Sequence, residues 1–181
     1  MLNGGHYAQI WVCTLAVDIG KKWRSICAMS APSQLDEAHA HELFSVECFN
    51  RAWSFMEKPQ RTPEEDEQML LLSHTALWHW TQRKDCAQRN LSIGYWHLAR
   101  IYALLGRAED ALRYGESCLR HSQNEPCFYL GYAHESLARA AMVGGDSQRA
   151  DRHLSEARRL AALIPDADER SMLEKDLETI K

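Results

Sequence analysis

Residues 95–111 read YWHLARIYALLGRAEDA, and residues 134–150 read HESLARAAMVGGDSQRA. The second stretch follows the first at an offset of 39 residues and repeats its Leu-Ala-Arg triplet. In both copies a glycine follows, and an alanine stands five residues after the glycine. Small alanines let paired helices approach closely, and glycine supplies the left-handed turn that ends a helix. Each copy therefore predicts a helical hairpin of the same design.

The composition of the whole chain also favours helices. The 181 residues include 22 Ala and 21 Leu, but only 16 residues of Val, Ile and Thr together. Ala and Leu are strong helix formers, whereas β-branched residues are more typical of strands. The length suits a single domain. We expect an all-α fold of stacked antiparallel helical hairpins.

Seven helical segments with a period near 3.6 residues are expected from residue 33 onward. They cover about residues 34–56, 63–82, 87–105, 108–121, 127–143 and 147–164, and a short charged helix follows residue 165. Thr62, Asp146 and Asp166 are the expected N-caps of three of these helices. Glu65 and Glu169, each three residues after a cap, complete two predicted capping boxes.

Residues 1–28 are interpreted as an N-terminal extension that contributes little to the fold, and residues 29–181 as one helical domain. Met29 and the residues after it resemble an ordinary protein start. The apolar stretch that begins at Tyr7 has no Lys or Arg before it, and Asp18 interrupts it. This favours neither a signal peptide nor a membrane span. A cleaved or anchoring signal is the alternative.

Charge and cysteine content restrict the partners and the compartment. The net charge is −4, and no cluster of five or more Lys and Arg occurs in the sequence. Nucleic acid is therefore not expected as a partner. A membrane is not expected either, because no uncharged apolar stretch of about 18 residues occurs. The six cysteines form no C-x-x-C pair. They are interpreted as small buried side chains in a reducing compartment, which predicts a cytoplasmic protein.

The two copies resemble the tetratricopeptide repeat (TPR) family over about residues 90–163. The first copy has the family's pattern at Tyr95, Leu98, Ala99, Tyr102, Gly106, Ala111 and Cys118. The second copy has His134 and Ala141 where aromatics are usual, and the 39-residue period exceeds the family's roughly 34. The helices before residue 83 resemble a degenerate unit. The resemblance implies a right-handed α-solenoid, here with a polar C-terminal capping helix.

The sequence contains none of the common catalytic or metal-binding motifs. His74 and His79 are five residues apart, which separates them by about 140° around a helix and does not suit a shared metal ion. No H-E-x-x-H, G-x-S-x-G or phosphate-binding glycine loop occurs. We therefore expect no enzyme activity, no metal site and no cofactor.

The family resemblance implies a binding groove, because the first helix of each TPR hairpin lines the concave surface. Transferred by position, it implies partner-binding residues at Trp96, His97, Arg100, Tyr132, Glu135 and Arg139. The two arginines suit carboxylates, so an acidic peptide or a chain terminus is the expected partner, with a second copy of the chain as another. The alternative is that Glu135 and Arg139 pair with each other on a solvated helix face.

Four of the six tryptophans, Trp53, Trp78, Trp80 and Trp96, fall within 44 residues. They either fill the junction between the first two hairpins or serve as anchors for a partner. The expected function is a non-enzymatic TPR-like module for protein–protein interaction. The alternative is a small-ligand sensor or degenerate enzyme with a pocket formed by these tryptophans and His74. A closed pocket of several hundred Å³ would favour the ligand, and an open groove the peptide.

Overall fold

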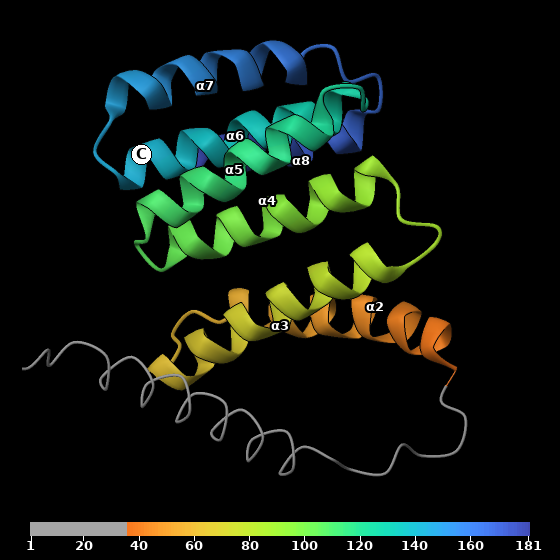
Figure 1. Ribbon diagram of the computed structural model, residues 1–181. Helices are drawn as coiled ribbons and strands as arrows, with labels where there is room; N and C mark the ends of the chain where they lie inside the picture. The colour runs from red at the N-terminus through yellow and green to blue at the C-terminus, as the bar shows by residue number, and fades with distance from the viewer. Residues whose placement is uncertain (1–35) are drawn as a thin grey trace, which may run out of the picture. The chain divides into compact units, whose positions relative to one another are not determined.

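The computed structural model describes residues 36–181, and the predicted division at residue 28 lies outside them. Within the described part seven α-helices and no strands occur, which confirms the all-α prediction (Figure 1). The helices are α2 (Glu37–Met56), α3 (Pro63–Gln82), α4 (Gln88–Leu104), α5 (Ala108–Ser122), α6 (Cys127–Val143), α7 (Ser147–Ala161) and α8 (Ala167–Glu178). None of these helices combines the length and apolar character needed to cross a bilayer.

Successive helices pack in pairs, α2 on α3, α4 on α5 and α6 on α7. The pairs follow one another in chain order, because α4 packs on α3, and α6 packs on both α4 and α5 (Figure 1). The first pair differs from the other two. The backbones of α4 and α6 come close to each other, whereas those of α2 and α4 do not. Among the described helices, the backbone of α2 packs closely on that of α3 alone.

The helix starts agree closely with the sequence. Thr62 accepts a hydrogen bond from the amide of Glu65, whose carboxylate accepts one from the Thr62 amide, so the first capping box is confirmed. Asp146 caps α7 by accepting from the amide three residues on. Asp166 accepts from the amide of Glu169, but the return bond of the second predicted box does not form. Asp166 also accepts from the amide of the intervening Asp168.

The repeated alanines occupy equivalent places in two hairpins. Ala99 and Ala138 on the first helices, and Ala111 and Ala150 on the second helices, are all fully buried. An alanine at such a site brings two helix backbones together without leaving a void, so a larger side chain would overpack it. The 39-residue repeat is therefore a repeat of packing contacts.

Helix α8 packs against α6 and α7 after the last hairpin. Leu173, Leu177 and Ile180 bury their side chains in the core that these helices share. The approach to α6 is close at Gly131, where an added Cβ would lie 2.5 Å from a methyl group of Leu173. One face of α8 is thus fixed by apolar packing, and this determines which of its polar residues face α4 and α6.

The turns of the two repeated hairpins contain glycines with positive φ, 71° at Gly106 and 77° at Gly145. Such angles are strained for residues that carry a Cβ. We predict that Gly145→Ala lowers the free energy of unfolding by about 1–2 kcal/mol, measured by urea denaturation.

The neighbouring Gly144 is the matched control, because its φ is −79°. Gly144→Ala adds a methyl group 3.3 Å from that of Ala108 and should cost less than the change at Gly145. Equal losses for the two variants would contradict the assignment of strain to the turn.

Candidate functional site

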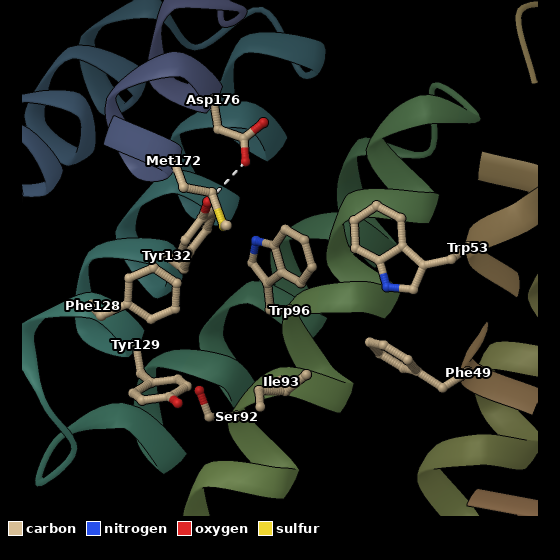
Figure 2. A pocket seen from close by; sticks show the side chains of 10 residues that line it. All are labelled: Phe49, Trp53, Ser92, Ile93, Trp96, Phe128, Tyr129, Tyr132, Met172 and Asp176. Atoms are coloured by element: carbon tan, nitrogen blue, oxygen red, sulfur yellow. Dashed lines mark hydrogen bonds between the residues drawn. The ribbon is translucent and has the colours of Figure 1, made fainter. Parts of the chain in front are cut away.

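A hollow of about 420 Å³ lies among α2, α4, α6 and α8. We call it the aromatic trough, because six of its ten lining side chains are aromatic (Figure 2). Its lining consists of Phe49, Trp53, Ser92, Ile93, Trp96, Phe128, Tyr129, Tyr132, Met172 and Asp176. A smaller hollow of about 170 Å³ shares Phe49 and Ile93 with it.

The trough exists because α2 meets α4 through large rings. The ring centroid of Phe49 lies 4.5 Å from that of His97, and the centroid of Trp53 lies 5.8 Å from that of Trp96. Rings of this size hold two helices further apart than small side chains do. The space between the helices is therefore filled only in part, and the rest is the trough.

The opposite wall is built from α6. The Tyr132 ring stands at 74° to Trp96 and at 73° to Phe128, with centroids 5.3 Å and 5.0 Å apart. Trp96 lies between these two rings and Trp53, so it forms the middle of the trough (Figure 2). Edge-to-face pairs of this kind are favourable and fix the orientation of each ring.

Met172 and Asp176 of α8 stand one helical turn apart at the edge of the trough. Met172 is 56% exposed, so this edge is open to solvent. One oxygen of Asp176 accepts a hydrogen bond of 3.0 Å from the Tyr132 hydroxyl. Burial, followed by the negative charge of Asp176, raises the pKa of Tyr132 far above its ordinary value. Tyr132 therefore remains a neutral donor.

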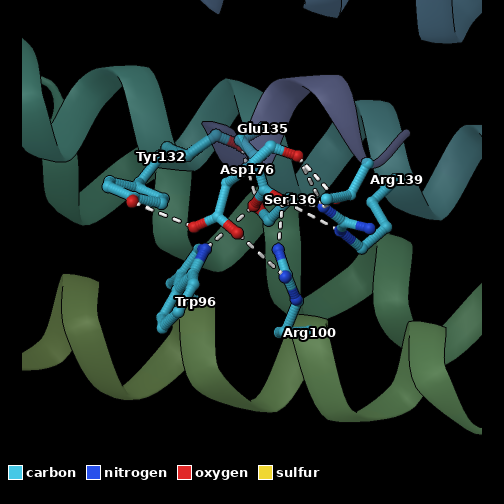
Figure 3. Close-up of polar contacts among 9 residues, drawn as sticks. Trp96, Arg100, Tyr132, Glu135, Ser136, Arg139 and Asp176 are labelled. Carbon is cyan, nitrogen blue, oxygen red and sulfur yellow. Dashed lines mark hydrogen bonds and ion pairs between the residues drawn. The ribbon is translucent and has the colours of Figure 1, made fainter. Parts of the chain in front are cut away.

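Behind Trp96 lies a buried carboxylate, that of Glu135, which is 0% exposed (Figure 3). One of its oxygens accepts from Arg100 at 2.6 Å and from two nitrogens of Arg139 at 2.8 and 2.6 Å. The other oxygen accepts from the Trp96 indole N–H at 3.0 Å. We call these residues, together with Asp176, the Glu135 cluster.

Asp176 adds the second carboxylate of the Glu135 cluster and connects it to α8. Its other oxygen accepts from Arg100 at 3.1 Å, and its backbone carbonyl accepts from Arg139 at 3.1 Å. Two guanidinium groups are therefore balanced by two carboxylates. A buried carboxylate is tolerated only when it is paired and fully hydrogen-bonded, and Glu135 meets both conditions.

The structure brings together five of the six predicted partner-binding residues, and Arg100, Glu135 and Arg139 are bonded to one another. Both arginines are paired with carboxylates of the chain itself, Glu135 and Asp176. Glu135 and Arg139 do pair, as the alternative held, but on a covered face instead of a solvated one. The reason is α8, which lies over this face.

The prediction that His97, the sixth partner-binding residue, lines the groove is wrong, because its side chain is only 1% exposed. It lies behind the wall that Phe49 and Trp53 form, and its Nδ1 is 3.1 Å from the Ser73 hydroxyl. Its Nε2 has no hydrogen-bond partner among the described residues. The position along α4 therefore correctly predicted that Trp96 lines the groove, but it did not predict that His97 is buried.

The alternative pocket of tryptophans and His74 does not form as one site. Trp53 lines the trough, whereas Trp80 lines the smaller hollow and carries Arg83 at 3.9 Å from its ring centroid. Trp78 is 55% exposed, and His74 is bonded elsewhere, to the Tyr102 hydroxyl at 2.9 Å. Trp80 lies on a different face of α3 from His74 and Trp78. His74 and Trp78 are one helical turn apart but contact different neighbours, Tyr102 and His41.

Six trough residues were not predicted from the sequence, and they are Phe49, Ser92, Phe128, Tyr129, Met172 and Asp176. Of the two on α6, Phe128 had a usable signal, since 128, 132, 135 and 139 follow one face of a helix. The two on α8 had none, because no local pattern says where a terminal helix will fold back.

No group of three or more His, Cys, Asp or Glu in the described part is arranged to hold a metal ion. Two histidine pairs occur there, His41 with His79 and His134 with His153, with Nδ1 atoms 2.8 and 3.0 Å apart. A neutral imidazole can donate to its neighbour at such distances, so each pair satisfies itself.

Comparison of the chain with protein-family models, curated proteins and solved structures gives no match in any of the three. The likeness to TPR proteins accordingly rests on the residue pattern and on helices that pack in neighbouring pairs.

We predict that Glu135→Ala lowers the free energy of unfolding by about 3–5 kcal/mol, because it removes the carboxylate that two largely buried guanidinium groups share. Glu116→Ala is the matched control, since Glu116 also pairs with an arginine, Arg149, at 3.0 Å but is half exposed. The control should cost less than about 1 kcal/mol in the same urea titration. Similar losses would show that the Glu135 cluster contributes no more than a surface ion pair.

The stability of the protein should fall in mild acid, in part because of His97. Burial lowers the pKa of His97 to about 4 from its ordinary 6.5. Between these values the unfolded chain binds a proton that the native protein does not, so stability is lost as the pH falls. Over the full range His97 contributes a loss of about 3 kcal/mol.

Urea titrations at pH 7 and pH 4.5 measure this effect, with His97→Gln as the comparison. The variant should lose about 2 kcal/mol less than the original chain between the two pH values. The other histidines titrate in both proteins, so they cancel from the difference. Parallel losses would place His97 in contact with water.

Proposed function

We propose that the chain is a non-enzymatic protein-binding module, a TPR-like right-handed α-solenoid that holds a peptide segment on its concave face. The aromatic trough is the observation that carries the proposal. It would receive an apolar or aromatic anchor of the peptide, since desolvated aromatic pockets of this kind supply most of the binding energy in protein interfaces.

The location of the trough supports this proposal. Its lining comes from α2, α4 and α6, which are the first helices of the three hairpins, and from α8. First helices are the ones expected on the concave face of a TPR stack. Of the predicted groove residues, Trp96 and Tyr132 line the trough.

The chemistry of the lining changes the expected partner. Arg100 and Arg139 are neutralised by Glu135 and Asp176, so they offer no free charge to an acidic peptide. The trough itself is formed mainly by rings and aliphatic groups. An apolar anchor therefore fits it better than a carboxylate does.

A small apolar ligand is the second candidate, and the volume of the trough favours it. At about 420 Å³ the hollow falls within the roughly 300–1,000 Å³ of small-molecule sites. The open edge beside Met172 favours the peptide, because it gives a backbone room to continue beyond the anchor.

Selection of random linear peptides against the full chain tests the proposal. We expect enriched peptides to share an apolar or aromatic anchor, and we expect Trp53→Ala to weaken their binding about tenfold or more, a loss of about 1.4 kcal/mol. Binding is measured by calorimetry, and circular dichroism checks that the variant is folded.

Trp78→Ala is the matched control, because Trp78 is an exposed tryptophan that does not line the trough. It should leave peptide binding unchanged. Equal losses in both variants, or loss only in the Trp78 variant, would overturn the trough as the docking site. Binding of small aromatic molecules without enrichment of any peptide would favour the second candidate.

A further inference from the structure

The aromatic trough combines many ring faces with a single carboxylate. Among the described residues no Lys, Arg or His side chain lines it, and Asp176 is its only charged lining residue. Aromatic faces carry partial negative charge and attract cations that lie over them. The electrostatic character of this lining is therefore suited to a positive group.

The ring planes of the trough are steeply inclined to one another. Tyr132 is inclined by 74° to Trp96, and Phe49 by 69° to Trp53. A compact cation in the trough would accordingly meet more than one face at once. Tyr129 already holds a guanidinium, that of Arg89, at 4.8 Å from its ring centroid.

The guanidinium groups of the Glu135 cluster do not reverse this character. Arg100 and Arg139 are bonded to Glu135, and neither lines the trough. Arg100 does share one oxygen of Asp176, and the Tyr132 hydroxyl holds the other. Asp176 is thus fixed in place at the trough edge, with its charge partly offset.

The scarcity of acceptors selects among cations. Besides Asp176, the side chains of the lining offer only the hydroxyl oxygens of Ser92, Tyr129 and Tyr132 as oxygen acceptors. A primary ammonium would bring donors that such a lining leaves unpaired at a cost in free energy. A trimethylated ammonium has no donors, presents an apolar surface and keeps its charge, so it matches rings and a carboxylate together.

We propose that the aromatic trough binds an alkylated ammonium group, borne by a trimethylated lysine side chain of the docked peptide. This inference rests on the proposed function, because it names the anchor of that peptide. The lysine stem would pass out by the open edge at Met172, with the methylated nitrogen among the rings of α2, α4 and α6.

Calorimetric titration with three peptides of one sequence tests the inference. They differ only in the anchor, which is trimethyl-lysine, unmodified lysine, or the neutral isostere with a tert-butyl group in place of trimethylammonium. We expect the trimethyl-lysine peptide to bind at least about tenfold more tightly than either of the others. Equal or tighter binding of the neutral isostere would overturn the inference.

Phe128→Leu removes one ring of the trough but keeps an apolar side chain. It should reduce the preference for the cation over its isostere while the isostere still binds. Phe44→Leu is the matched control, since Phe44 is exposed and lies outside the trough. Asp176→Asn should reduce the same preference, and because the readout is a ratio, a general loss of stability does not imitate it.

The outcomes separate this inference from the proposed function. If peptides with apolar anchors bind at the trough but the cation gains nothing over its isostere, only the inference fails. If neither the peptides nor their isosteres bind, both fail. If free choline binds as tightly as the trimethyl-lysine peptide, the claim that a peptide carries the ammonium group is wrong.

Discussion

The buried carboxylate of Glu135 is the interaction on which the arrangement of α4, α6 and α8 depends. Arg100 approaches it from α4, Arg139 from its own helix, and both arginines also bond to Asp176 or its carbonyl group on α8. Trp96 donates to the same carboxylate. One charged group therefore orients the central ring of the trough and fixes the helix that forms the trough edge.

The repeat explains why this cluster can form. Trp96 and Glu135 occupy equivalent positions in successive copies, 39 residues apart, as do Arg100 and Arg139. Stacking two copies places these positions side by side on adjacent first helices. Helix α2 does not continue this regularity, and it meets α4 through Phe49 and Trp53.

Local signals in the sequence predicted the parts of the fold that depend on neighbouring residues. The capping box at Thr62 and the turn at Gly145 depend on contacts within a few residues, and both occur as expected. The candidate site was predicted only in part. Exposure on a helix face depends on what covers it, and nothing near Glu135 in the sequence shows that α8 returns to supply Asp176. The burial of His97 likewise depends on distant residues, because Phe49 and Trp53 of α2 cover it.

We propose that the trough among α2, α4, α6 and α8 is the binding site, with the Trp96 ring oriented by Glu135. The indole N–H signals in ¹H–¹⁵N NMR spectra of the full chain test it most directly, once each is assigned by single substitution. Adding the trimethyl-lysine peptide should shift the signals of Trp53 and Trp96 and leave that of Trp78 in place. Shifts confined to Trp78, or no shift at Trp53 and Trp96 when the peptide is bound, would contradict the account.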